Sequence, residues 1–149
     1  MDSADRLLRH YLARVEADLG TGETTNSQLD DYCTRHLGPG LFRGVYGVRR
    51  DDVSGRPART HEAYCFIQNT QPAPTPGHWL LIVHVPGHTP VAFDSYARDF
   101  GIAFQPHLAG HARTHGDVDQ FRADHCGQLC CAAAMIFRDY GLEVMRAAA

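Results

Sequence analysis

Apolar and polar residues recur along the chain with two different periods, and this change of period separates predicted helices from predicted strands. Apolar residues three and four positions apart predict helices at 4–18, at 27–37 and from Cys126 to Tyr140. Short runs rich in β-branched and aromatic residues predict strands at 41–48, 63–69, 78–85 and 89–95. Helices, then a meander of strands, then a helix indicate the α+β class, with a small mixed or antiparallel central sheet flanked by helices.

Local signals predict where the helices begin and end. Ser27 and Asp30 fit an S-x-x-D capping box that opens the second helix, and Gly38 fits its end. Asp124 is a predicted N-cap for the last helix, and Gly141 is its predicted stop. The alanine run inside this last helix favours helix formation, so the helix is expected to be regular and buried.

The strand region is predicted to contain a hairpin. Residues 78–85 are apolar almost throughout, which is typical of a central strand buried on both faces. Pro86-Gly87-His88 predicts a tight turn, after which residues 89–95 return as the partner strand. Residues 97–119 contain Gly, His and Pro without a regular period and are expected to be irregular.

The length of 149 residues suits one domain that covers residues 1–149. Within residues 1–22, an amphipathic helix carries Leu8, Leu12 and Val15 on one face and arginines on the other. Such a helix is either an appendage that binds a partner or a part of the core, and its apolar face favours the second interpretation.

Charge and cysteine usage argue against several classes of protein. The net charge is −3, all fourteen basic residues are arginine, and no basic run is longer than Arg49-Arg50, so charge does not support a nucleic-acid partner. No apolar run is long enough to span a bilayer, so no membrane partner is expected. Five cysteines without finger spacing favour an intracellular, reducing compartment over a disulfide framework or structural zinc. Neither a cofactor nor a metal is expected.

Cys126 is the candidate nucleophile. It stands in the first turn of the last predicted helix, where unpaired backbone N–H groups and the helix dipole favour a thiolate. Gly127 leaves room beside the sulfur. A buried, inert cysteine at a helix start is the alternative, because a thiol needs a base as well as a location.

His78 and Asp94 are the candidate base and its orienting carboxylate. With a three-residue turn, antiparallel pairing sets Val85 opposite Thr89 and Leu80 opposite Asp94. His78 and Asp94 then share one face of the hairpin as diagonal neighbours, within reach of polar side chains. A slip of one residue would separate them onto opposite faces.

Gln120 is the candidate oxyanion donor. It lies six residues before Cys126, on the segment that leads into the last helix. Its amide could donate to a developing oxyanion together with the Cys126 backbone N–H. A single Gln in a loop is usually solvated, so this role depends on the other three residues.

The order His78, Asp94, Gln120, Cys126 resembles that of adenain, the adenovirus maturation protease family, and of the wider clan whose members process SUMO and ubiquitin-like proteins. Further similar motifs are Q-x5-C-G over 120–127, C-G-x-x-C-C over 126–131, N-T followed by H-W at 69–79, and L-G-P followed by G-V-Y at 37–46. The resemblance covers roughly residues 27–137.

This resemblance implies a minimal adenain-like cysteine protease fold and a role for each site residue. Cys126 would be the nucleophile, His78 the general base, Asp94 the orienting acid where adenain has Glu, and Gln120 part of the oxyanion hole. Amide hydrolysis would pass through an acyl-thioester at small or glycine-containing sites. Adenain substrates are virion precursor proteins, which would place a viral homologue in the host nucleus or the virion.

Adenain is activated by DNA and by a disulfide-linked peptide, and neither activator is carried over here. The negative net charge argues against DNA. Cys33 and Cys65 are expected to be core thiols rather than anchors for a peptide.

Three alternatives stay open. A deSUMOylating or deubiquitinating isopeptidase would use the same four residues. An acetyltransferase would use the same triad, although no separate feature supports it. A non-enzymatic interaction domain would hold its many His and Cys residues for structure or for metal binding.

Overall fold

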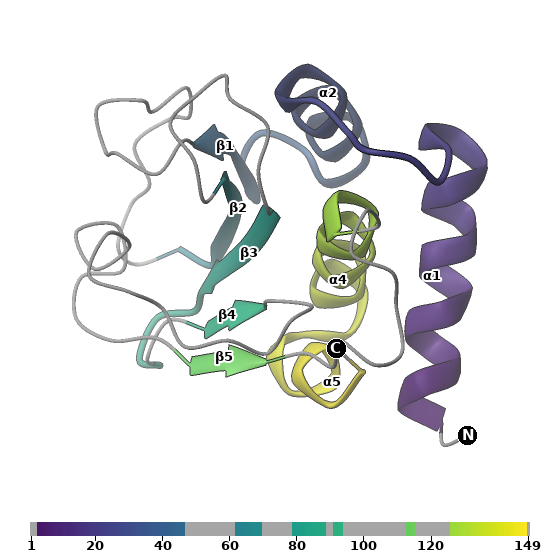
Figure 1. The fold of residues 1–149 in the computed structure, drawn as a ribbon. Helices are drawn as coiled ribbons and strands as arrows, with labels where there is room; N and C mark the ends of the chain where they lie inside the picture. Colours follow the sequence, from purple (N-terminus) through teal and green to yellow (C-terminus); the bar gives the residue numbers. More distant parts are fainter. Residues whose placement is uncertain are drawn as a thin grey trace.

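The computed structural model describes residues 3–46, 62–69, 79–88, 91–93, 113–115 and 126–148. Within these ranges, four helices lie on one side of a five-stranded mixed sheet (Figure 1). The elements are α1 (Ser3–Leu19), α2 (Asn26–Leu37), β1 (Phe42–Tyr46), β2 (Tyr64–Asn69), β3 (Trp79–His84), β4 (Val91–Phe93), β5 (Arg113–His115), α4 (Cys126–Tyr140) and α5 (Leu142–Ala148). The predicted α+β class with a mixed sheet is confirmed.

The sheet has the strand order β1-β2-β3-β4-β5. The three central strands pair antiparallel, whereas β1 runs parallel to β2 and β5 runs parallel to β4. In the hairpin, Leu81 lies opposite Phe93 and Val83 lies opposite Val91. These pairs follow the register that the sequence predicted, because a three-residue turn leaves no other alternation.

The hairpin turn forms at the predicted position. The His88 N–H donates to the Val85 carbonyl oxygen at 3.0 Å, which closes the turn. Gly87 has a φ of 83°, a left-handed conformation that costs glycine little and most other residues more.

Strand β3 is the central strand, and both its faces are buried as predicted. One face meets the main core below the helices, and the other meets a smaller cluster on the far side of the sheet. Trp79, Leu81 and Val83 belong to the main core, and Leu80 and Ile82 belong to the smaller cluster with Phe66 and Ala92.

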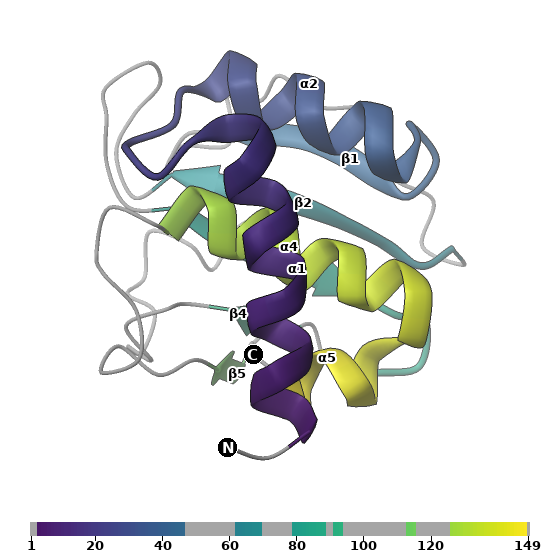
Figure 2. The same cartoon turned by 90° about the vertical axis from the view of Figure 1, so that its right-hand side faces the viewer.

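Helix α4 fills the space between the sheet and the other helices. Every residue from Cys126 to Phe137 is buried. Figure 2 shows α1 crossing α4, with α2 and α5 on either side of the crossing. The helix ends at Gly141 as predicted, where φ is 91° and the N–H donates to the Phe137 carbonyl oxygen at 2.9 Å. The predicted N-cap, Asp124, lies outside the described residues.

Helix α1 packs on α4 through its apolar face. Leu8, Leu12 and Val15 are buried and belong to the main core. Their spacing of three and four residues places them on one side of the helix. The N-terminal helix therefore contributes to the same core as α4.

The capping box of α2 differs from the prediction. The Gln28 N–H donates to Thr25 Oγ1 at 3.2 Å, and the Thr25 N–H donates to Gln28 Oε1 at 2.9 Å. The predicted cap, Ser27, lies inside the helix, and Asp30 accepts a hydrogen bond from Thr34 instead. The prediction was wrong by two positions because Gln serves as the return partner of a Thr cap as well as an acid does.

Two elements were not predicted. Strand β5 lies within residues 97–119, which were expected to be irregular, and it pairs with β4. Helix α5 follows directly after Gly141, which was expected only to end α4. Both are short, so their sequences carry little periodic signal.

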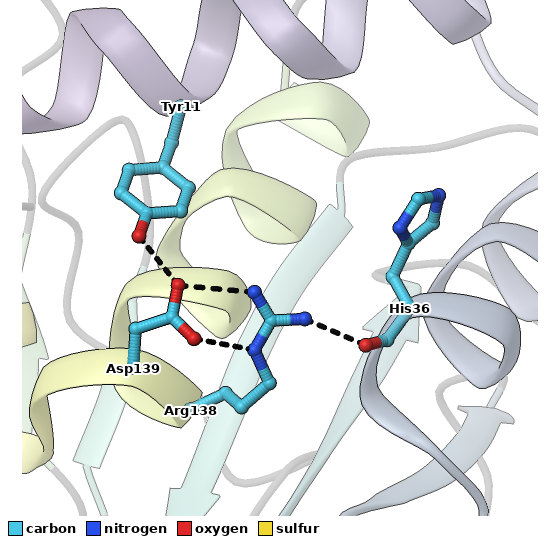
Figure 3. Close-up of polar contacts among 4 residues, drawn as sticks. All are labelled: Tyr11, His36, Arg138 and Asp139. Atoms are coloured by element: carbon cyan, nitrogen blue, oxygen red, sulfur yellow. Dashed lines mark hydrogen bonds and ion pairs between the residues drawn. The ribbon is translucent and has the colours of Figure 1, made fainter.

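A polar clasp joins three helices at the far end of α4 (Figure 3). The Tyr11 hydroxyl donates to the Asp139 carboxylate, and the Arg138 guanidinium donates to the same carboxylate at 2.6 and 3.0 Å. Arg138 also donates to the His36 carbonyl oxygen at 2.6 Å. The hydrogen bond from Arg138 lowers the pKa of Asp139, while burial and the bond to Asp139 raise the pKa of Tyr11 to about 12.

The clasp predicts a pH-dependent contribution to stability. Because the pKa of Asp139 is lower in the folded protein than its ordinary 3.8, its stabilising effect is present above that value. The effect is lost as pH falls through the lowered pKa. We expect Asp139→Asn to reduce the free energy of unfolding by about 1 kcal/mol near neutral pH. Urea unfolding should show this difference shrinking in acid, and the exposed Asp31→Asn serves as control. A difference that does not change with pH would contradict this account.

Candidate functional site

Cys126 is the first residue of α4 and lies against the beginning of β3. Its Sγ accepts a hydrogen bond from the Trp79 N–H at 3.5 Å. At 7% exposure it is the least buried of the five cysteines, all of which are free thiols. A backbone N–H that donates to sulfur holds a thiolate better than a thiol, because hydrogen bonds to a charged acceptor are stronger. The sulfur therefore has one donor already in place.

The chain segments that lead to the predicted site meet along the edge of the sheet at which β2, β4 and β5 end and β3 begins. Strand β3 begins at this edge at Trp79, which lies opposite Asn69 at the end of β2. Strand β4 is antiparallel to β3 and ends here at Phe93. Strand β5 is parallel to β4 and ends here at His115. The hydrogen bond to Trp79 places the start of α4 at the same edge.

Three of the four predicted site residues, His78, Asp94 and Gln120, lie outside the described residues. Their neighbours in the sequence are the strand ends just described. His78 directly precedes Trp79, Asp94 directly follows Phe93, and Gln120 comes five residues after the end of β5. Of the four, only Cys126 is described, and its contact is with the residue next to His78.

The alternation of β3 sets a condition on the predicted base. Trp79 and Leu81 face the helices, and Leu80 faces the opposite side of the sheet. A side chain that continued this alternation at position 78 would face away from α4. The predicted role of His78 as base for Cys126 therefore requires that the alternation does not continue beyond Trp79 to position 78.

The other cysteines are core thiols. Cys33 Sγ donates to Cys131 Sγ at 3.4 Å, which joins α2 to α4 without a covalent bond. The hydrogen bond with Cys131 and burial raise the pKa of Cys33, and burial raises the pKa of Cys65. Both side chains are fully buried, as predicted.

Sequence reasoning gave Gly127 only the role of leaving room beside the Cys126 sulfur, and it gave Gln128 no role. Gln128 is fully buried, and its Nε2 donates to the carbonyl oxygens of Gly20 at 2.9 Å and Gly22 at 2.7 Å. A Cβ at Gly127 would overlap Thr24 Oγ1, so a larger residue would have to displace Thr24 or the first turn of α4. Glycine avoids this overlap, although it costs a helix about 1 kcal/mol relative to alanine. The available signal was Gln128 itself, the one polar side chain in an otherwise apolar run from 126 to 137.

Comparison with protein-family models and with curated proteins finds no match for this chain. Across the ranges that the structure describes, no three His, Cys, Asp or Glu residues come together as a metal site. No helix in those ranges has the length and apolar character needed to cross a membrane.

The burial pattern predicts which thiol reacts first. In the native protein, iodoacetamide should alkylate Cys126 before any other cysteine, because this residue is the least buried of the five. Cys33, Cys65, Cys130 and Cys131 should react only after unfolding, because their sulfurs are buried and thiolate is the reactive form. Peptide mapping by mass spectrometry over time would measure the order. Labelling of Cys33 or Cys65 ahead of Cys126 in the native protein would contradict the assignment.

Proposed function

We propose that the chain is a cysteine endopeptidase of the adenain type, with Cys126 as nucleophile. The observation that carries the proposal is the hydrogen bond from the Trp79 N–H to Cys126 Sγ. It joins the first residue of a buried helix to the strand that begins one residue after His78. A nucleophile on a helix start needs a base from a separate segment, and this contact brings such a segment to the sulfur.

The topology supports the remaining assignments. The end of β4 leads directly into Asp94, and the chain after β5 leads through Gln120 into α4. Because both strands end at the edge where Cys126 lies, short connections suffice to bring a carboxylate and an amide to the site. We assign Asp94 as the group that orients His78 and Gln120 as the oxyanion donor.

The reaction begins with attack of the Cys126 thiolate on the carbonyl carbon of the scissile bond. The Cys126 N–H and the Gln120 amide stabilise the oxyanion of the tetrahedral intermediate. The His78 imidazolium gives its proton to the leaving amine as the C–N bond breaks, which leaves an acyl-thioester. Water that has lost a proton to His78 then attacks the thioester and the C–S bond breaks, which releases a carboxylic acid and restores the Cys126 thiolate beside the His78 imidazolium.

The resemblance to adenain provides the proposed substrate class. Substrates are proteins or peptides with small residues, especially glycine, around the scissile bond. Precursors of virion proteins are the proposed natural substrates. We propose no activating peptide and no activating nucleic acid for this chain. For the nucleic acid, the reason is the net charge of −3, which does not support a DNA-binding surface.

Replacing the nucleophile or the base should remove activity without unfolding the protein. Cys126→Ala and His78→Ala should each lower the rate of cleavage of a panel of Gly-Gly-containing peptides by at least about 10²-fold. One acid–base group contributes roughly 10²–10⁴-fold, and loss of the thiol removes the covalent step altogether. Liquid chromatography of the products would measure cleavage, and circular dichroism would check the fold. Cys65→Ala is the matched control, since it removes a buried thiol from β2. Wild-type activity in either site variant would rule out this mechanism.

Asp94→Asn should cost less activity than His78→Ala. An orienting group positions the base and its tautomer but does not itself transfer the proton. Raising the pH should not restore the lost rate, because orientation rather than ionisation is what the variant loses. The measurement is the pH profile of cleavage for both variants. Complete rescue at high pH would remove Asp94 from the proposed triad.

Two further experiments distinguish the proposed endopeptidase from the alternative functions. SUMO and ubiquitin probes with a reactive C-terminal group would label Cys126 if the chain is an isopeptidase. Metal analysis of the purified protein would detect stoichiometric zinc if the Cys and His residues serve an interaction domain. Peptide cleavage that is blocked by alkylation, without probe labelling and without zinc, is the outcome expected for an endopeptidase.

A further inference from the structure

The segment between α1 and α2, residues 20–25, lies against the first turn of α4. Gln128 Nε2 donates to the carbonyl oxygens of both Gly20 and Gly22. At Gly127, an added Cβ would overlap Thr24 Oγ1. The two residues that follow Cys126 are therefore both in direct contact with this segment, which we call the α1–α2 linker.

The linker is itself fixed at both ends. At its start, Gly20 has a φ of 81° and its N–H donates to the Glu16 carbonyl oxygen at 2.8 Å, which ends α1. At its end, Thr25 and Gln28 form the capping box that opens α2. The position of the linker is thus set by two packed helices.

Cys126 lies between the linker and the sheet. On the sheet side, its sulfur accepts the Trp79 N–H at 3.5 Å. On the linker side, Gly127 and Gln128 determine how closely the first turn of α4 approaches Thr24. Because a helical turn moves as a unit, a displacement at Gln128 also displaces the sulfur from the Trp79 N–H.

We infer that the α1–α2 linker positions the nucleophile. Gln128 acts as a positioning residue, and the contact between Thr24 and Gly127 limits how closely the first turn of α4 approaches the linker. Neither group touches substrate. Their effect is to hold the Cys126 sulfur where it receives the Trp79 N–H. The inference deepens the proposed peptidase function and rests on it for calling Cys126 the nucleophile. Its test does not rest on that function, because thiol alkylation reports the position of the sulfur without any substrate.

Gln128→Met provides the first test, since methionine keeps the length of the side chain and removes the donors. The rate of Cys126 alkylation by iodoacetamide is measured across a pH series. We expect the profile of the variant to move to higher pH, which makes alkylation slower at neutral pH, because a sulfur displaced from the Trp79 N–H loses a donor that favours the thiolate. Ile136→Val is the matched control: it removes a buried methyl group eight residues beyond Gln128 along α4, away from the linker. This control should lower the melting temperature without moving the profile.

A double-mutant cycle provides the second test and decides the matter if Gln128→Met does not fold. Gly127→Ala should slow alkylation of Cys126, because the new Cβ pushes the first turn away from Thr24. Adding Thr24→Ala removes the nearest obstructing atom and should restore most of the rate. An unchanged profile in folded Gln128→Met, or no restoration by Thr24→Ala, would overturn the inference.

The outcomes for positioning and for function are separable. If the Gln128→Met profile shifts while the wild-type protein cleaves no peptide, the linker positions the thiol and the peptidase proposal fails. If the wild-type protein cleaves peptides while the Gln128→Met profile stays in place, the peptidase proposal stands and the linker inference fails.

Discussion

The structure depends on the complete burial of α4. From Cys126 to Phe137 no residue is exposed, so this helix has to match the sheet on one side and three helices on the other. Ala132, Ala133 and Ala134 are fully buried, and their small side chains allow the neighbouring elements to pack closely on the helix. Both ends of the helix are then held by polar contacts, at Gln128 near the start and at Arg138 and Asp139 near the finish. A reactive group on the first turn of such a helix has a defined place in the fold.

This burial explains why much of the fold could be predicted. Helix α4 is buried from Cys126 to Phe137 and strand β3 is buried from Trp79 to Val83, and an element that is buried on all sides has a mostly apolar sequence. The hairpin register was predictable for a related reason. Its short turn and the buried faces of β3 and β4 allow one alignment, and the described pairs have it.

The features that were missed depend on contacts between distant segments. The cap of α2 is an exception: it is a local motif, and it was missed because Gln28 rather than an acid returns the hydrogen bond to Thr25. Strand β5 has the sequence Arg-Thr-His, in which no alternation is visible, and it exists as a strand through its pairing with β4. The partners of Gln128 lie more than a hundred residues away, so no local pattern could have identified them. For the site, the sequence correctly placed Cys126 at the start of α4, whereas its role as nucleophile and the roles of His78, Asp94 and Gln120 stay predictions.

The account requires that the imidazole of His78 reaches the Cys126 sulfur across the end of β3. A bifunctional alkylating agent, 1,3-dibromoacetone, tests this most directly, because it bridges a thiol and an imidazole that lie within hydrogen-bonding proximity. After reaction of the native protein with one equivalent of reagent, mass spectrometry of the proteolytic fragments identifies the bridged pair. The account predicts a cross-link between Cys126 and His78. Modification of Cys126 with no bridge to His78, or with a bridge to another histidine, would contradict it.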